Sequence, residues 1–184
     1  MPVFESAAMI PPQTRREALT EVRAQLDTVS GSILNIRVGG NDLSHAFGLR
    51  RPANRTIYDL RPVADILIDI VAAFGTQYVV SGPVWEYYSG EGWEEGLRRE
   101  MELDLLNGFT GKTVIHPNQI PVVNEMLRVS QRDYADARAI LNWDTGSGSL
   151  VSASEDGGRM NEYNTHSRWA RRIVLRAERY GVRA

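Results

Sequence analysis

Short runs of strand-forming residues alternate with longer segments of helical periodicity, and this alternation constrains the fold more than any other feature of the chain. Such alternation joins neighbouring strands by crossovers, which predicts a parallel sheet. The predicted strands are Val3–Glu5, Ile33–Val38, Tyr78–Ser81 and Lys112–His116. The predicted helices are one that is capped by Thr14 and continues to Leu26, and Pro62–Phe74, Trp93–Asn107, Ile120–Leu127, Asp133–Asn142 and Thr165–Tyr180.

Two parallel architectures fit four such units: an open doubly wound sheet and part of an eight-stranded barrel. A complete barrel needs about 250 residues, so a chain of 184 residues has room for half of one. The second strand favours the barrel, because Ile36 and Val38 share one face and Asn35 and Arg37 share the other. A buried open sheet is apolar on both faces. The sequence therefore predicts half of a (β/α)8 barrel over residues 1–145, followed by a C-terminal helical extension over residues 146–184.

Charge and cysteine content narrow the classes of function. Lys and Arg number 21 against 23 Asp and Glu, so the formal net charge of −2 gives no reason to expect a nucleic-acid or membrane-surface partner. The absence of cysteine excludes disulfides and thiolate metal sites, and it fits a reducing cytoplasm. The longest apolar stretch, Val63–Phe74, is too short to cross a bilayer. No Walker or dinucleotide glycine motif is present, so a small-molecule substrate without a nucleotide cofactor is expected.

Polar side chains stand at the carboxyl ends of the predicted strands. Glu5 ends the first strand, Asp42 follows the Gly-Gly turn after the second, and His116 ends the fourth. Because the carboxyl ends of parallel strands meet at one rim, two carboxylates there suit Mg²⁺; helix caps or solvated loop residues are the alternative interpretation. His116 is a candidate acid or base, or a structural hydrogen-bonding residue. Arg37, on the inward face, needs an anionic partner, either a structural carboxylate or that of the substrate.

Several motifs resemble the citrate lyase β-subunit and 2-oxo-acid aldolase superfamily. The run Gly108–Ile120 (GFTGKTVIHPNQI) is similar to the motif of the eighth barrel strand in that superfamily. Phe4–Ala7, Gly40–Leu43 and Ser81–Pro83 resemble its fifth, sixth and seventh strand motifs. The resemblance implies that the four predicted strands are strands 5–8 of a TIM barrel.

A narrower resemblance is to C–C bond lyases that are often encoded beside tellurium-resistance genes. The segments that carry it are Pro2–Ala7, Phe47–Arg51, Ser81–Glu86, Arg159–Glu162 and Trp169–Arg172.

The resemblance implies a metal-dependent lyase or aldolase. Glu5 and Asp42 correspond to the superfamily's magnesium ligands, with Mn²⁺ as an alternative, and the cation would stabilise an enolate formed from a 2-oxo acid or a coenzyme A thioester. In acyl-CoA members an acid of the C-terminal lid, often from a neighbouring subunit, moves the proton. Glu162 corresponds to it, and His116 and Arg37 are further catalytic candidates.

The chain also departs from the superfamily's pattern. Ser81 stands where the pattern has an acid, and the strands that carry the substrate-binding arginine are absent, so Arg37 or Arg50 would have to replace it. A half barrel exposes two sheet edges. We therefore expect a fragment of a longer protein, a partner chain that supplies strands one to four, or a homo-oligomer. The alternatives to an enzyme of this kind are a non-catalytic scaffold subunit and, less well supported, a phosphate-binding half barrel resembling isomerases.

Overall fold

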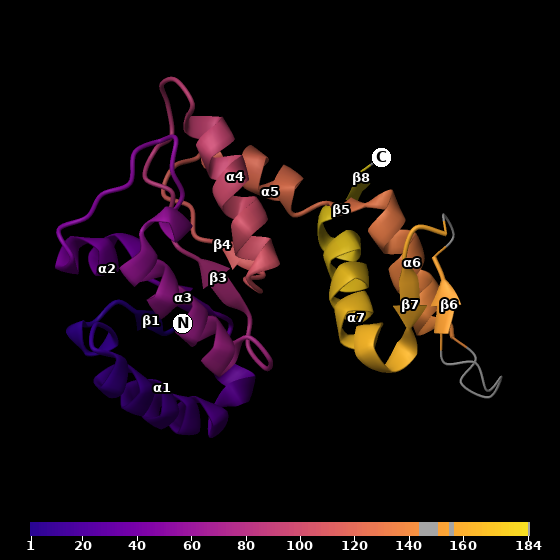
Figure 1. The fold of residues 1–184 in the computed structure, drawn as a ribbon, viewed down its shortest axis with the longest axis horizontal. Coiled ribbons are helices and arrows are strands. Elements are labelled where there is room, and N and C mark those ends of the chain that lie inside the picture. The colour runs from indigo at the N-terminus through magenta and orange to yellow at the C-terminus, as the bar shows by residue number, and fades with distance from the viewer. Residues whose placement is uncertain (144–150, 155–156, 184) are drawn as a thin grey trace. The chain divides into compact units, whose positions relative to one another are not determined.

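A parallel sheet forms the centre of the N-terminal part of the molecule (Figure 1). The computed structural model describes residues 1–143, 151–154 and 157–183. The four strands pair in sequence order and all neighbours are parallel, which confirms the predicted parallel sheet. The strands are β1 (Val3–Phe4), β2 (Ile36–Val38), β3 (Val80–Gly82) and β4 (Gly111–Lys112).

The fourth strand ends earlier than predicted. β4 stops at Lys112, whereas the sequence predicted a strand as far as His116. The backbone N–H of Ile115 donates to the side chain of Gln119 (3.0 Å). The apolar run Val114–Ile115 therefore leaves the sheet and leads into the next helix.

Helices connect the strands of this part. They are α1 (Pro12–Asp27), α2 (Gly40–Ala46), α3 (Arg61–Phe74), α4 (Trp93–Leu106) and α5 (Gln119–Met126), with 3-10 turns at Ala7–Met9, Ser30–Ser32 and Ile57–Asp59. The prediction that Thr14 caps the first helix was wrong. That helix begins at Pro12. Proline suits the first helical position because it has no backbone N–H that would need a hydrogen-bond partner there. The Thr14 hydroxyl instead donates to the backbone carbonyls of Ala8 and Pro11.

The two faces of the sheet differ in polarity. Phe4, Ile36 and Val38 are buried in one core with apolar residues of α1 and α3, and the rings of Phe4 and Phe74 lie 5.0 Å apart. Arg37 lies on the opposite face, as the alternation along β2 predicted, and it is only half-buried. We call this opposite face the inner face.

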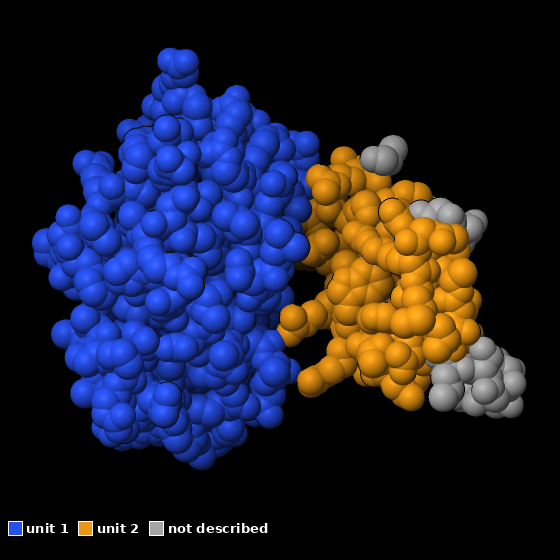
Figure 2. Space-filling view, in the orientation of Figure 1, with its two compact units in different colours: residues 1–126 blue, residues 127–184 orange. Residues whose placement is uncertain are grey.

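Residues 127–184 form a second compact unit, separate from unit 1 (Met1–Met126), and Figure 2 colours the two units. Apolar residues of α6 and α7 share one core, and the Ser130 side chain caps α6 by accepting from Asp133 N–H (3.0 Å). The elements of unit 2 are β5 (Val129–Ser130), α6 (Gln131–Leu141), β6 (Val151–Ala153), β7 (Met160–Glu162), α7 (Tyr163–Tyr180) and β8 (Val182–Arg183).

The sequence pattern predicts that residues 127–145 belong with the barrel part. In the structure these residues belong to unit 2, where α6 packs on α7. The predicted turn at Gly146–Ser149 lies outside the described residues. Within the described ranges, no helix is sufficiently long and apolar to cross a membrane.

Candidate active site

Two carboxylates converge on one glycine at the carboxyl ends of β1 and β2. Glu5 directly follows β1, and Asp42 lies in the first turn of α2, which begins after the turn at Gly39. A methyl group placed on Gly39 would lie 2.5 Å from Glu5 Oε2 and 2.9 Å from Asp42 Oδ2. Both carboxylate oxygens therefore occupy the space that a side chain at position 39 would need. Glycine is required here because of this close approach, since the φ angle of Gly39 is negative.

The chain leaves this carboxylate pair without a counterion. Both side chains are exposed, and within residues 1–143, 151–154 and 157–183 neither forms an ion pair. In the same ranges, no cluster of three or more His, Asp or Glu residues suits a metal. Two carboxylates with open positions around them match the ligand preference of Mg²⁺, which keeps several waters and substrate oxygens. The donor set at Gly39 thus fits a hard divalent cation.

Arg37 lies on the inner face, near the carboxylate pair. Its register partners are Val3 on β1 and Ser81 on β3, and its Nε donates to Thr113 Oγ1 (3.3 Å) just beyond β4. Gly39 lies one residue beyond the end of β2 and two positions after Arg37.

His116 is held by local contacts at the turn before α5. Its Nδ1 accepts from Asn118 N–H (3.2 Å), and its ring stacks on Tyr88 with centroids 4.1 Å apart. These contacts support the structural interpretation of this histidine. An accepting Nδ1 places the proton of the neutral ring on Nε2, so Nε2 is the nitrogen that remains for proton transfer.

Glu162 begins the last helix of unit 2. It is the N-cap residue of α7, its Oε2 accepts from the Thr165 hydroxyl (3.2 Å), and its backbone N–H donates to His166 Nδ1 (3.0 Å). Its role as acid or base stays a prediction.

A second pair of carboxylates is completely buried on α4. Glu100 and Asp104 are one turn apart, and Lys112 Nζ lies 2.7 Å from each of them. Lys112 is the only lysine in the sequence. Tyr58 donates its hydroxyl to Asp104 (2.7 Å), and a methyl group on Gly82 would lie 2.5 Å from Asp104 Oδ2. Burial raises the pKa of Asp104, and Lys112 opposes that shift.

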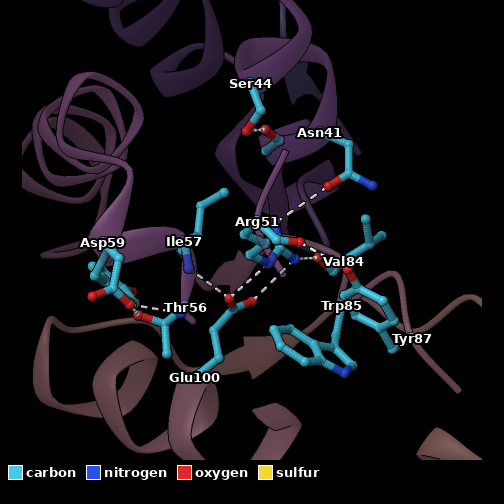
Figure 3. Close-up of polar contacts among 12 residues, drawn as sticks. Asn41, Ser44, Arg51, Thr56, Ile57, Asp59, Val84, Trp85, Tyr87 and Glu100 are labelled. Carbon is cyan, nitrogen blue, oxygen red and sulfur yellow. Dashed lines mark hydrogen bonds and ion pairs between the residues drawn. The ribbon is translucent and has the colours of Figure 1, made fainter. Parts of the chain in front are cut away.

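Arg51 completes this buried network and connects it to the rim (Figure 3). Its Nε lies 3.1 Å from Glu100 Oε2, which also accepts from Ile57 N–H (2.7 Å). The guanidinium donates to the Val84 carbonyl and to Asn41 Oδ1 (3.3 Å). Arg51 therefore ties the segments after β2 and β3 to α4, and it fixes the loops beside the carboxylate pair.

Sequence reasoning missed this network. The signals present were Glu100 and Asp104 at i and i+4 on one helix, which places them on one face, and a single lysine directly after Gly111. The neighbouring Arg50 is exposed and pairs with Glu86 (3.2 Å). Arg50 and Glu86 help to line a cavity of about 370 Å³ on α2, and Glu5 and Asp42 are not among its lining residues.

A family model described as C–C bond lyase of the TIM-barrel fold matches residues 1–182. The chain belongs to this C–C bond lyase family. The match confirms the superfamily resemblance and the TIM-barrel class predicted from the motifs, and the parallel sheet agrees with it.

Two proteins that are similar to this chain are a lyase named for coenzyme A esters and a protein solved with coenzyme A bound. L-malyl-CoA/β-methylmalyl-CoA lyase from Cereibacter sphaeroides is 38% identical over 74 residues, which are 39% of this chain and 22% of the relative. The CitE protein from Mycobacterium tuberculosis, solved in complex with magnesium, acetoacetate and coenzyme A, aligns with a TM-score of 0.57 and 25% identity over 79% of this chain and 52% of that one. The chain spans about half the length of CitE and less of the lyase.

Proposed function

We propose that this C–C bond lyase works with a divalent cation held by Glu5 and Asp42. The observation that carries the proposal is the convergence of these two unpaired carboxylates on Gly39, at the carboxyl ends of neighbouring parallel strands. Ligands of α/β barrels bind at this end of the strands. Mg²⁺ is the expected ion and Mn²⁺ the alternative, because both are hard cations that bind carboxylate oxygens.

The reaction forms or breaks a C–C bond next to a carbonyl. A bound cation supplies positive charge at the carbonyl oxygen, where the enolate develops, and this contributes several kcal/mol to lowering the barrier. Glu5 and Asp42 bind and orient the cation. Arg37 binds a negative group of the substrate. Glu162 or Nε2 of His116 transfers the proton to or from carbon. The substrate class is a 2-oxo acid or an acyl-CoA thioester. The names of the two relatives, a malyl-CoA lyase and a CitE with coenzyme A bound, support it.

We infer that the catalytic unit is a closed barrel and that the sheet of unit 1 is half of it, equivalent to strands 5–8. Among the described residues, β1 and β4 each have one strand neighbour, and Val3 on the inner face of β1 is 44% exposed. Further strands of the same polypeptide, a complementing chain or a second copy would each close the barrel. We place the reaction in the cytoplasm, on the absence of cysteine.

A scaffold subunit without catalysis is the second candidate. Ser81 favours it, because the inner face carries a buried hydroxyl in the middle of β3, where an acid would support proton transfer. A scaffold of this kind would keep the fold and the buried network but would not bind a cation or turn over a substrate.

Turnover in the protein with its barrel closed tests the proposal. L-malyl-CoA and a 4-hydroxy-2-oxo acid represent the two substrate classes, and phenylhydrazine traps the carbonyl product. We expect activity that needs Mg²⁺ and that falls about 100-fold or more in Glu5→Gln and in Asp42→Asn. Asp65→Asn, which changes an exposed carboxylate of α3, is the matched control. Activity that survives both substitutions, or that persists in EDTA, would contradict the metal role.

A further inference from the structure

Arg51 is a buried cation whose place is fixed from two sides. Its side chain is 1% exposed, its Nε lies 3.1 Å from Glu100 Oε2, and its guanidinium donates to the Val84 carbonyl. The guanidinium carbon also lies 5.1 Å from the centre of the Trp85 ring. These contacts hold the guanidinium between α4 and the segment after β3 (Figure 3). Because hydrogen bonds between charged groups are strong and directional, Arg51 is a fixed point in unit 1.

One N–H group of this guanidinium points at α2. Arg51 Nη1 donates to Asn41 Oδ1 (3.3 Å), and Asn41 directly precedes Asp42 in the first turn of the helix. Because a guanidinium has only donors, the side chain of Asn41 must present its oxygen to Arg51. The amide nitrogen of Asn41 lies on the side away from Arg51 in Figure 3. Among the residues that the structure describes, this is the only side-chain hydrogen bond that connects α2 to the rest of unit 1.

Few side-chain contacts set the orientation of α2. The helix is seven residues long, and its N-cap residue, Gly39, has no side chain that could cap the first turn. Helices this short depend on tertiary contacts, and Leu43 supplies one because it is completely buried in the core of unit 1. Asn41 and Leu43 flank Asp42 in the sequence, and successive helix positions point about 100° apart. The direction of the Asp42 side chain is therefore set from both sides, by the core and by Arg51.

We propose that Arg51 and Asn41 are positioning residues for the cation site, and that the buried network thereby determines how Asp42 faces Glu5. This inference rests on the proposed function, which takes the cation to bind at these two carboxylates. Groups that orient the ligands of a metal typically change its affinity by about 10- to 100-fold. They also affect selectivity, because Mg²⁺ requires near-ideal octahedral geometry, whereas Ca²⁺ accepts flexible coordination. Loss of the bond to Asn41 therefore weakens Mg²⁺ binding more than Ca²⁺ binding.

Separate titrations of Mg²⁺ and Ca²⁺ into the protein with its barrel closed test the inference. We expect Asn41→Ala to lose about 10-fold in Mg²⁺ affinity and less than about 3-fold in Ca²⁺ affinity, so that the ratio of the two affinities falls. Arg51→Lys keeps the charge beside Glu100 but lacks the planar set of donors, and it should lower the ratio in the same way. His45→Ala changes an exposed residue of the same helix and should bind both cations as wild type does.

Hydrogen exchange in EDTA measures the order of α2 separately from metal binding. The backbone N–H of Leu43 donates to the Gly39 carbonyl (3.0 Å) and so reports on the first turn. We expect this N–H to exchange about 10-fold faster in Asn41→Ala than in His45→Ala, which has a similar gain in helix propensity, while both variants melt within about 4 °C of wild type.

Two kinds of negative result can be distinguished. A wild-type protein that binds no Mg²⁺ would overturn the proposed function and this inference with it. A wild-type protein that binds Mg²⁺ would overturn the inference alone if Asn41→Ala kept the same ratio of Mg²⁺ to Ca²⁺ affinity, or if the exchange of the Leu43 N–H were unchanged.

Discussion

Unit 1 contains two pairs of neighbouring carboxylates, and the chain treats them in opposite ways. Glu100 and Asp104 are buried, and Lys112 bonds to both of them. Glu5 and Asp42 are exposed and have no cationic partner among the described residues. Asp104 of the buried pair lies against Gly82, and both acids of the exposed pair lie against Gly39, so that a methyl group added at either glycine would occupy the space of a carboxylate oxygen.

This contrast separates acids whose charge the fold compensates from acids whose charge it leaves open. A fold that buries a carboxylate must supply its counterion from the same chain, because an uncompensated buried charge is very costly. A fold that brings two carboxylates together at a sheet rim without a counterion leaves that task to a ligand. The buried pair therefore contributes to a single native arrangement of α4 and β4, and the exposed pair is available for a cation.

Removing the only lysine should have the largest effect on stability. Lys112→Met leaves Glu100 paired with Arg51 and leaves Asp104 with no ion-pair partner among the described residues, so we expect a loss of about 3–5 kcal/mol in the free energy of unfolding. Urea denaturation monitored by circular dichroism measures it. Arg61→Met, at a largely exposed site, should change stability by less than about 0.5 kcal/mol. Equal losses of unfolding free energy in the two variants would mean that Lys112 does not stabilise the buried carboxylates Glu100 and Asp104.

A methyl group at Gly82 should have the next largest effect. Gly82→Ala places Cβ 2.5 Å from Asp104 Oδ2, which bonds to Lys112, while Asp104 Oδ1 accepts from Tyr58, and we expect a loss of about 1–3 kcal/mol. Gly31→Ala is the matched control, because nothing lies within 4 Å of the added Cβ. Thermal unfolding of both variants provides the comparison, and a Gly82→Ala protein as stable as Gly31→Ala would show that the Asp104 carboxylate can move.

Neutralising the exposed pair should cost almost no stability. In EDTA, Glu5→Gln with Asp42→Asn removes two unpaired negative charges, so the free energy of unfolding should stay the same or rise by up to about 1 kcal/mol. The corresponding Glu100→Gln with Asp104→Asn should be strongly destabilised, since Lys112 would lose both counterions. Urea unfolding of the two double variants checks the contrast, which fails if both lose stability to the same degree.

The contribution of Asp59 to stability, which depends on pH, should be the smallest of these effects. Asp59 is the reciprocal partner in the capping box at Thr56 (Figure 3), and the backbone N–H of Thr56 holds the pKa of this carboxyl below its usual range. Because the folded-state pKa is depressed, the stabilisation is present above the unfolded pKa of about 4 and is lost as the pH falls through the folded-state value. Asp59→Asn should cost about 0.5 kcal/mol at neutral pH and less at pH 3. A cost that does not shrink in acid would argue against the capping role.

Local periodicity predicted much of the fold and the position of the carboxylate pair. The helices of unit 1 longer than one or two turns follow the predicted segments closely, for example Arg61–Phe74 against Pro62–Phe74. The strand alternation placed Arg37 on the polar inner face. The helix Gly40–Ala46 was missed because it begins with glycine and is too short for a periodic pattern. Val129–Ser130 pairs with Val182–Arg183, and two residues carry no alternation from which such a long-range pairing could be predicted.

The carboxylates themselves show the limit of sequence reasoning. Glu5 and Asp42 were predictable as rim residues because each directly follows a strand or its turn. Whether an acid is neutralised depends on residues far away in the chain, as Arg51, Glu100 and Lys112 show. The spacing of Glu100 and Asp104 on α4 does not predict which cations pair with them. Arg51 comes from the segment before α3 and Lys112 from β4.

Calorimetric titration of Mg²⁺ into the protein with its barrel closed decides whether Glu5 and Asp42 hold a cation. We expect wild-type protein to bind one cation per chain and Glu5→Gln with Asp42→Asn to give no heat above background. Glu17→Gln with Asp65→Asn removes the same charge from exposed helix positions and should bind as wild type does. Binding of equal strength in the two double variants would contradict the cation site at Glu5 and Asp42.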